Sequence, residues 1–168
     1  MNAETLRSMQ ATLKERYRAQ PETALVTLYA EGRLEDGLTC RILTGKPGVP
    51  AGLHPATGGD GSAACSGEML LEALVGCAGV TLGAVSTALG IELRSATIRA
   101  EGDVDFRGTL GVSKETPVGF QRIRLQLALD TSAPREQIEK LVQLTERYCV
   151  VYQTLRQSPQ INALISFL

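Results

Sequence analysis

The feature that most constrains this chain is a stretch without a charged side chain, residues 73–91. Its length is close to the roughly 20 apolar residues that a transmembrane helix needs. No Lys or Arg anchors its amino-terminal side, and small or polar residues interrupt it at Gly76, Gly79, Thr81, Gly83, Ser86 and Thr87. It also leads directly into a strand-like sequence. We therefore expect a buried central helix of a globular domain, not a membrane span.

This central helix has recognisable ends. Ser66 is a residue type that caps helix amino termini, and Glu68 and Glu72 follow in the first turns, where the helix dipole favours carboxylates. Gly90 readily takes the left-handed conformation that ends helices. The sequence thus predicts a helix from Ser66 to about Leu89.

Three elements are expected before the central helix. Residues 4–18 carry apolar side chains three or four positions apart and predict an amphipathic helix that ends before Pro21. Residues 24–31 and 38–44 have strand character, and the Gly-containing turn between them indicates a β-hairpin. Residues 45–61 are so rich in Gly and Pro that we expect a loop or flap there.

Two strands and then two helices are expected directly after the central helix. Residues 94–106 and 121–130 alternate apolar and polar side chains, which is typical of half-buried strands. Pro134 suits the first turn of a helix whose apolar stripe, Ile138, Leu141, Val142, Thr145 and Cys149, puts that cysteine on the buried side. A second short helix follows as far as Arg156.

The last alternating run, residues 161–167, predicts a final strand. The order of helix, hairpin, helix, hairpin, helices and strand is that of an α+β fold. We divide the chain into a helical amino-terminal extension, residues 1–20, and a single domain, residues 21–168.

The composition narrows the possible functions. The 168 residues hold 17 Lys and Arg against 18 Asp and Glu, a net charge of −1 that argues against a nucleic-acid binder. Aromatic residues make up 4% and Trp is absent, so stacking platforms for bases or sugars are not expected. The four cysteines form no C-x-x-C pair, and no signal-peptide pattern precedes them, which favours free thiols in a reducing cytoplasm.

Cys77 lies inside the uncharged helix and has two interpretations. A buried cysteine is often only a small hydrophobic residue whose thiol is inert. To act as a nucleophile, Cys77 needs a cation that stabilises its thiolate, because it lies too far along its helix to use that helix's own amino-terminal dipole. Arg33, Arg41 and Arg99 are the available arginines, and Glu68 is a carboxylate suited to orient a guanidinium.

Cys149 is the natural second thiol. At the carboxyl end of its helix the dipole opposes a thiolate, so it suits a resolving role better than an attacking one, although a core residue remains the alternative. We interpret Cys40 and Cys65 as structural. His54 is the one histidine and has neither a G-x-S-x-G elbow nor a metal-ligand spacing to work with, so no metal or cofactor site is expected.

Four motifs together resemble the OsmC/Ohr family of osmotically induced and organic-hydroperoxide-resistance proteins. They are Gly58–Gly61, Ser66–Cys77, Gly90–Ile91 and Thr145–Cys149. The resemblance covers roughly residues 24–160 in order. It implies an OsmC-like fold in which antiparallel or mixed sheets wrap around buried central helices. It further implies an intertwined homodimer with its active sites at the subunit boundary, and thiol-dependent reduction of organic hydroperoxides.

The resemblance also implies a role for each candidate site residue. Cys77 resembles the peroxidatic thiol and Cys149 the resolving thiol of a two-cysteine cycle. Glu68 resembles the carboxylate that steadies an arginine, and Arg33, with Arg41 as the alternative, resembles that arginine. The substrate would be an organic hydroperoxide, and an external dithiol, either a lipoylated protein or a thioredoxin-like reductant, would restore the thiols. No cofactor, nucleic acid or membrane is implied.

Two other functions compete with the peroxidase. One is a non-catalytic OsmC-like dimer that binds a small hydrophobic ligand, and the other is a purely structural or interaction protein. An arginine guanidinium within about 4 Å of the Cys77 sulfur would favour the peroxidase, because its positive charge would stabilise the thiolate.

Overall fold

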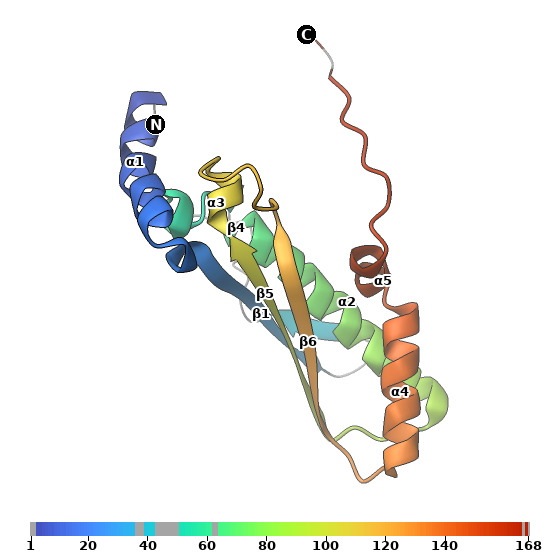
Figure 1. Ribbon diagram of the computed structural model, residues 1–168. Coiled ribbons are helices and arrows are strands. Elements are labelled where there is room, and N and C mark those ends of the chain that lie inside the picture. The colour runs from blue at the N-terminus through green and yellow to red at the C-terminus, as the bar shows by residue number, and fades with distance from the viewer. Residues whose placement is uncertain (1–2, 36–38, 43–50, 62–63, 166, 168) are drawn as a thin grey trace.

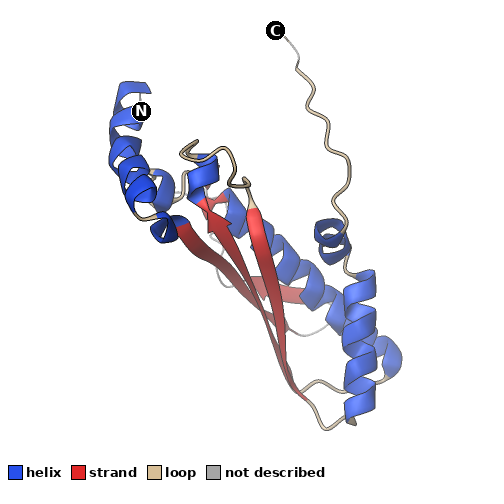
Figure 2. Cartoon of the chain, viewed as in Figure 1, coloured by secondary structure: helices blue, strands red, loops and turns tan. Residues whose placement is uncertain are grey.

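The computed structural model describes residues 3–35, 39–42, 51–61, 64–165 and 167. Its elements are α1 (Ala3–Ala19), the 3-10 helix η1 (Pro21–Ala24), β1 (Leu25–Glu35), β2 (Thr39–Ile42), β3 (Ala51–Gly52), the 3-10 helix η2 (Pro55–Thr57), β4 (Ala64–Cys65), α2 (Ser66–Leu89), β5 (Ser95–Asp105), α3 (Phe106–Thr109), β6 (Phe120–Asp130), α4 (Arg135–Tyr148) and α5 (Val150–Arg156). This mixture of helices with an open antiparallel sheet confirms the predicted α+β class (Figure 2).

The main sheet has four antiparallel strands in the order β2-β1-β5-β6. β5 shows the predicted alternation, because Ala96, Ile98, Ala100 and Val104 are buried while polar residues between them face the other side. The helix α2 packs along the sheet, and α4 and α5 lie beside it (Figure 1). The core is therefore the layer between α2 and the apolar face of the sheet.

The central helix is the best-predicted element. It runs from Ser66 to Leu89, and Gly90, with a φ of 66°, ends it in the left-handed conformation. The predicted N-cap was wrong by one residue, since Cys65 is the N-cap and Ser66 is already the first helical residue. The preceding β4 holds Cys65 in an extended conformation and so sets the boundary.

By length and composition alone α2 could cross a membrane, with a mean hydropathy of 1.7. In the structure one stripe of it is buried in the core: Leu71, Leu74, Val75, Ala78, Leu82 and Val85. This stripe packs against the sheet and against α4, as expected for the central helix of a domain.

The helices α4 and α5 follow one another almost without a break. Leu141, Thr145 and Cys149 are four residues apart and fully or almost fully buried, which confirms the predicted stripe. Cys149 is both the C-cap of α4 and the N-cap of α5. The chain therefore turns at Cys149 while the side chain stays in the core.

The first hairpin differs from its prediction in length. The strand β1 continues to Glu35, so Arg33 belongs to this strand and not to the turn, whose residues 36–38 lie outside the described part. Pairing with β5 as well as β2 extends β1, because Arg33 has strand partners on both sides. The Gly- and Pro-rich segment is also more regular than expected, since β3 and η2 form within its described residues 51–61.

The predicted final strand is absent from the described residues 157–165 and 167. This segment runs away from the rest of the chain (Figure 1). Its apolar side chains are almost fully exposed: Ile161 at 87%, Leu164 at 95%, Ile165 at 81% and Phe167 at 95%. A strand needs a partner to satisfy its backbone groups, and none reaches this segment among the described residues.

The amino-terminal helix α1 is tied to the domain through Tyr17. The tyrosine ring is completely buried, and its hydroxyl donates a hydrogen bond of 2.6 Å to the carbonyl oxygen of Ala56, in the middle of η2. α1 also contacts η1 and α3. It thereby covers the turn that leads towards α2.

Replacing Tyr17 with Phe should lower the free energy of unfolding by about 1 kcal/mol or more, because the carbonyl of Ala56 loses its buried donor. Urea denaturation followed by circular dichroism measures the change. Tyr148→Phe is the matched control, since Tyr148 is 58% exposed, and it should leave stability unchanged. Equal stability of Tyr17→Phe and the parent would show that α1 is held by apolar packing alone.

Candidate thiol site

Two of the predicted site residues meet in the fold. Cys77 lies in the middle of α2 and is half-buried, and Cys149 lies at the α4–α5 junction with no exposed surface. Their thiols interact through a hydrogen bond, although 72 positions separate them in the sequence (149 against 77). The packing of α4 and α5 against α2 brings them together.

Cys77 is the more acidic of the two thiols. Burial on its own raises the pKa of Cys77, but hydrogen bonds outweigh this effect and leave the pKa below its usual value. The donors are, in order of influence, the Val151 amide, the Cys149 thiol, the Val150 amide and the Thr81 hydroxyl. All of them favour the charged form of the sulfur, so Cys77 is suited to act as a nucleophile.

Cys149 has the opposite character. Burial, together with the neighbouring Cys77, raises the pKa of Cys149 to about 11, although the Tyr152 amide acts in the opposite direction. That amide donates to the Cys149 sulfur over 3.4 Å. Cys149 therefore stays a protonated thiol at neutral pH, whereas Cys77 loses its proton more readily than an ordinary cysteine. The pair is asymmetric, as resolving and attacking roles require.

The groups that favour the thiolate differ from those expected. The sequence analysis expected an arginine to stabilise the Cys77 thiolate. Among the described groups that lower the pKa of Cys77, two are instead backbone amides, those of Val150 and Val151. Both belong to the first turn of α5, directly after Cys149. The pattern that could have indicated them is a helix beginning immediately after the second cysteine.

Thr81 is the second group that sequence reasoning missed. It lies four residues after Cys77 on α2, the spacing that places two side chains on one helix face. This spacing was visible in the sequence, but threonine is also common in buried helices for other reasons.

The arginine candidates fall into two groups. Arg99 lies between the buried Ile98 and Ala100 on β5, so it faces the side of the sheet away from α2. It pairs with Glu101 at 3.1 Å and is not at the thiol site. The side chains of Arg33 and Arg41 lie outside the described part of the chain. The backbone register places these two arginines directly opposite each other on β1 and β2.

Glu68 lies in the first turn of α2 and is half-buried. The group it acts on among the described residues is His54. Burial lowers the pKa of His54, and the negative charge of Glu68 opposes this effect. His54 stacks on Phe106 with ring centroids 5.0 Å apart, and its Nδ1 accepts a hydrogen bond of 3.0 Å from the Ala56 amide. Glu68 therefore meets the turn at η2, more than two helical turns from Cys77.

Two grooves flank the thiol pair. The α2–α4 groove has a volume of about 420 Å³ and is lined by Val80, Thr81, Ala84, Val85, Ala88, Leu89, Leu144 and Tyr148. The β6–α5 groove has a volume of about 370 Å³ and is lined by Leu74, Phe120, Gln121, Arg122, Ile123, Leu125, Tyr152, Leu155 and Arg156. Both volumes are large enough for a small organic molecule.

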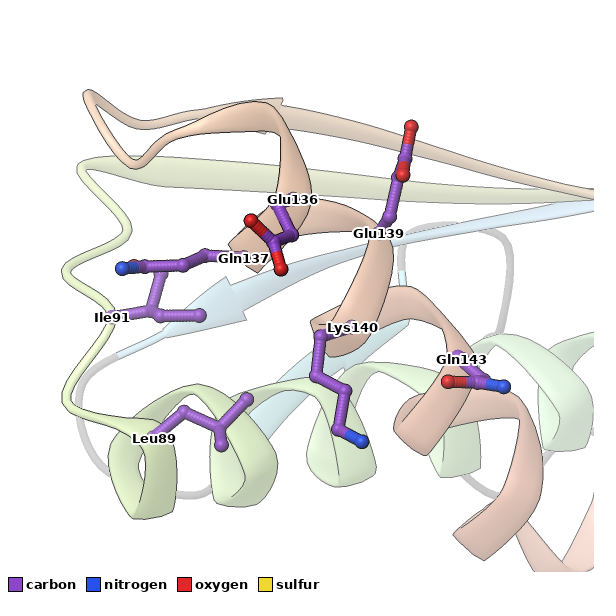
Figure 3. Close-up of a pocket in the computed structure, with 7 residues that line it drawn as sticks. All are labelled: Leu89, Ile91, Glu136, Gln137, Glu139, Lys140 and Gln143. Atoms are coloured by element: carbon purple, nitrogen blue, oxygen red, sulfur yellow. The ribbon is translucent and has the colours of Figure 1, made fainter.

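A larger hollow of about 890 Å³ lies elsewhere (Figure 3). It is lined by Leu89 at the carboxyl end of α2, by Ile91 just after it, and by residues of α4 that include Lys140, whose side chain points toward α2. Leu89 is about 18 Å along the helix axis from Cys77, at the usual rise of 1.5 Å per residue. This hollow therefore lies far from the Cys77 sulfur, although it shares Leu89 with the α2–α4 groove. The described residues contain no group of three or more His, Cys, Asp or Glu side chains that could hold a metal ion.

Comparison with known proteins decides the family. A family model described as "OsmC-like protein" matches residues 59–163, which include the whole of α2, the sheet strands β5 and β6, and both cysteines of the thiol pair, Cys77 and Cys149. The chain belongs to the OsmC-like family. The predicted resemblance is confirmed, and α1 lies before the matched segment.

A solved structure shares the fold. It is the crystal structure of an OsmC-like hydroperoxide resistance protein from Jannaschia sp. CCS1, with a TM-score of 0.63 and 14% sequence identity. The similarity covers 86% of this chain and 95% of that chain. No match was found among curated proteins. At this identity the crystal structure establishes a common OsmC-like architecture.

Replacing Cys77 with Ser should lower the pKa of Cys149 below about 11, because the neighbouring group that disfavours its thiolate is removed. The measurement is the ultraviolet absorbance of thiolate against pH, in a background where Cys40 and Cys65 are replaced with Ser. Cys149→Ala should raise the pKa of Cys77, because the Cys77 sulfur loses the hydrogen bond that the Cys149 thiol donates. Unchanged titration of the remaining thiol in both variants would show that the sulfurs do not interact.

Proposed function

We propose that this protein is a thiol-dependent peroxidase that reduces organic hydroperoxides by a two-cysteine cycle. The observation that carries the proposal is the contact between a thiol of lowered pKa, Cys77, and one of raised pKa, Cys149. Membership of the OsmC-like family and a fold shared with a hydroperoxide resistance protein support it.

In the first step the Cys77 thiolate attacks the distal oxygen of the hydroperoxide. The sulfur gains an S–OH group and is oxidised, the O–O bond breaks, and the reduced fragment leaves as an alkoxide that takes a proton to become an alcohol. The amides of Val150 and Val151 hold the thiolate before attack. The apolar residues of the flanking grooves favour hydroperoxides with alkyl or fatty-acid chains over hydrogen peroxide.

In the second step Cys149 condenses with the sulfenic acid on Cys77. The S–S bond forms, and the hydroxyl group leaves with the Cys149 proton as water. The neighbour effect that raises the pKa of Cys149 comes from the Cys77 thiolate, which no longer exists after oxidation. Cys149 is therefore easier to ionise once Cys77 has reacted, and the Tyr152 amide is already in place to receive its negative charge.

The remaining parts of the cycle follow the family resemblance. An external dithiol, a lipoylated protein or a thioredoxin-like reductant, takes up the oxidising equivalents and restores both thiols. Arg33, steadied by Glu68, is the proposed arginine of the peroxide-binding state, with Arg41 opposite it as the alternative. A cytoplasmic location fits this cycle, because free thiols persist in a reducing compartment.

The proposed assembly is an intertwined homodimer with its active sites at the subunit boundary. The carboxyl-terminal segment carries exposed Ile161, Leu164, Ile165 and Phe167 and leaves the body of its own subunit. β6 is an edge strand of the main sheet, and such an edge is a natural template for an added strand. A second copy of this chain offers that edge, and α2 adds exposed apolar residues at Met69, Leu70 and Val80.

Replacing both Ile161 and Ile165 with Asp should convert the dimer to a monomer, because charges would enter the apolar contact. Sedimentation equilibrium measures the molecular mass. Asn162→Asp is the matched control, since it adds a charge in the same exposed segment without removing an apolar side chain, and it should remain dimeric. A monomeric parent protein would contradict the proposed assembly.

The alternative is a non-catalytic OsmC-like dimer that binds a small hydrophobic ligand. The α2–α4 groove favours it, because apolar side chains form most of its lining. The two functions differ in what happens to the thiols on exposure to a hydroperoxide. A binding protein leaves them intact, and a peroxidase oxidises them.

Thiol titration after a stoichiometric dose of cumene hydroperoxide tests the cycle. The parent protein should lose two thiols per chain, since one peroxide forms one Cys77–Cys149 disulfide. Cys77→Ser should lose none, and Cys149→Ser should lose one, as a sulfenic acid on Cys77. Cys65→Ser is the control and should lose two, like the parent. Unchanged thiols in the parent would reject the peroxidase and favour the binding protein.

A further inference from the structure

Thr81 occupies an unusual position for a threonine in a buried helix. It is half-buried on α2, one turn after Cys77, and its hydroxyl hydrogen-bonds the Cys77 sulfur. Residues four apart on a helix share one face, so the backbone of α2 holds this hydroxyl beside the thiol.

Other hydroxyl groups on the same helix behave differently. Thr87 donates to the carbonyl oxygen of Gly83 over 2.8 Å, and Ser86 donates to the same carbonyl over 3.0 Å. Bonding to a carbonyl one turn back is the usual behaviour of Ser and Thr inside helices. The contact of Thr81 with a sulfur therefore differs from that of its helical neighbours.

Thr81 also faces the space that a substrate could enter. It lines the α2–α4 groove, where the neighbouring side chains of α2 are Val80, Ala84 and Val85. The hydroxyl thus lies between an apolar groove and the proposed nucleophile. A hydroperoxide whose alkyl group fills the groove would bring its polar end to this hydroxyl and to the sulfur together.

We propose that Thr81 is a catalytic residue that donates a hydrogen bond first to the Cys77 thiolate and then to the peroxide oxygen that leaves as alkoxide. This inference rests on the proposed peroxidase function and adds a residue to its first step. A hydroxyl hydrogen can turn from one acceptor to the other without movement of the helix.

The chemistry of the step explains why such a donor is useful. As the sulfur takes the distal oxygen, two electrons pass from sulfur to the O–O bond, and the negative charge moves to the proximal oxygen. The departing alkoxide then takes a proton from solvent. A donor aimed at the oxygen where charge develops stabilises this transition state, and removal of one such donor typically costs about a hundredfold or more in rate. Thr81 is partly exposed and the amides of Val150 and Val151 remain, so we expect a loss on the order of tenfold.

The test compares Thr81→Val, which keeps the shape and removes the hydroxyl, with Thr81→Ser, which keeps the hydroxyl. Thr87→Val is the matched control on the same helix, because its hydroxyl bonds a carbonyl. The rate constant for oxidation of Cys77 by cumene hydroperoxide is measured by stopped flow across pH. Alkylation of Cys77 by iodoacetamide is measured over the same range.

Thr81→Val should oxidise about tenfold more slowly even at pH values where Cys77 is fully ionised, and its alkylation profile should shift to higher pH. Thr81→Ser should behave like the parent in both assays, and Thr87→Val should too. An unchanged oxidation rate in Thr81→Val, or equal losses in Thr81→Val and Thr87→Val, would overturn the inference. Should Thr81→Val not fold, Thr81→Ala replaces it under the same criteria. If the parent protein itself does not react with cumene hydroperoxide, the proposed function fails, and this inference fails with it for that separate reason.

Discussion

The packing of α4 and α5 against α2 is the constraint on which the rest of this molecule depends. It brings Cys149 into the core with no exposed surface and sets its sulfur against that of Cys77. Each helix alone would hold an ordinary cysteine. Together they form a thiol pair in which burial and hydrogen bonding act in opposite directions, so that the pKa of Cys77 is lowered and that of Cys149 is raised.

The sequence was sufficient to predict the two cysteines and the helices that carry them. Cys77 lies in an uncharged helix and Cys149 at the end of an amphipathic stripe, and both patterns depend on local spacing. The amides that favour the Cys77 thiolate were not predictable in this way. Backbone groups have no sequence signature, and their approach to Cys77 depends on where α5 starts and how it packs.

The fold was predictable where the local sequence pattern alone determines a helix or strand. α2, β5, β6, α4 and α5 all lie close to their expected bounds. The errors arise where pairing with another strand determines the secondary structure of a segment. Arg33 belongs to a strand because β1 pairs on both sides. Residues 161–167 alternate like a strand. Such alternation indicates that one face would be buried in a sheet, but it does not show which strand, from this chain or another, would pair with the segment.

Cys149 has one further property that follows from its position. It ends α4 and begins α5, and its sulfur accepts the Tyr152 amide at the start of the second helix. Any covalent change at this sulfur alters the acceptor that the amide meets. If the proposed disulfide forms, its formation would change this hydrogen bond, and solvent exchange of the Tyr152 main-chain proton would report whether Cys149 is a thiol or a disulfide.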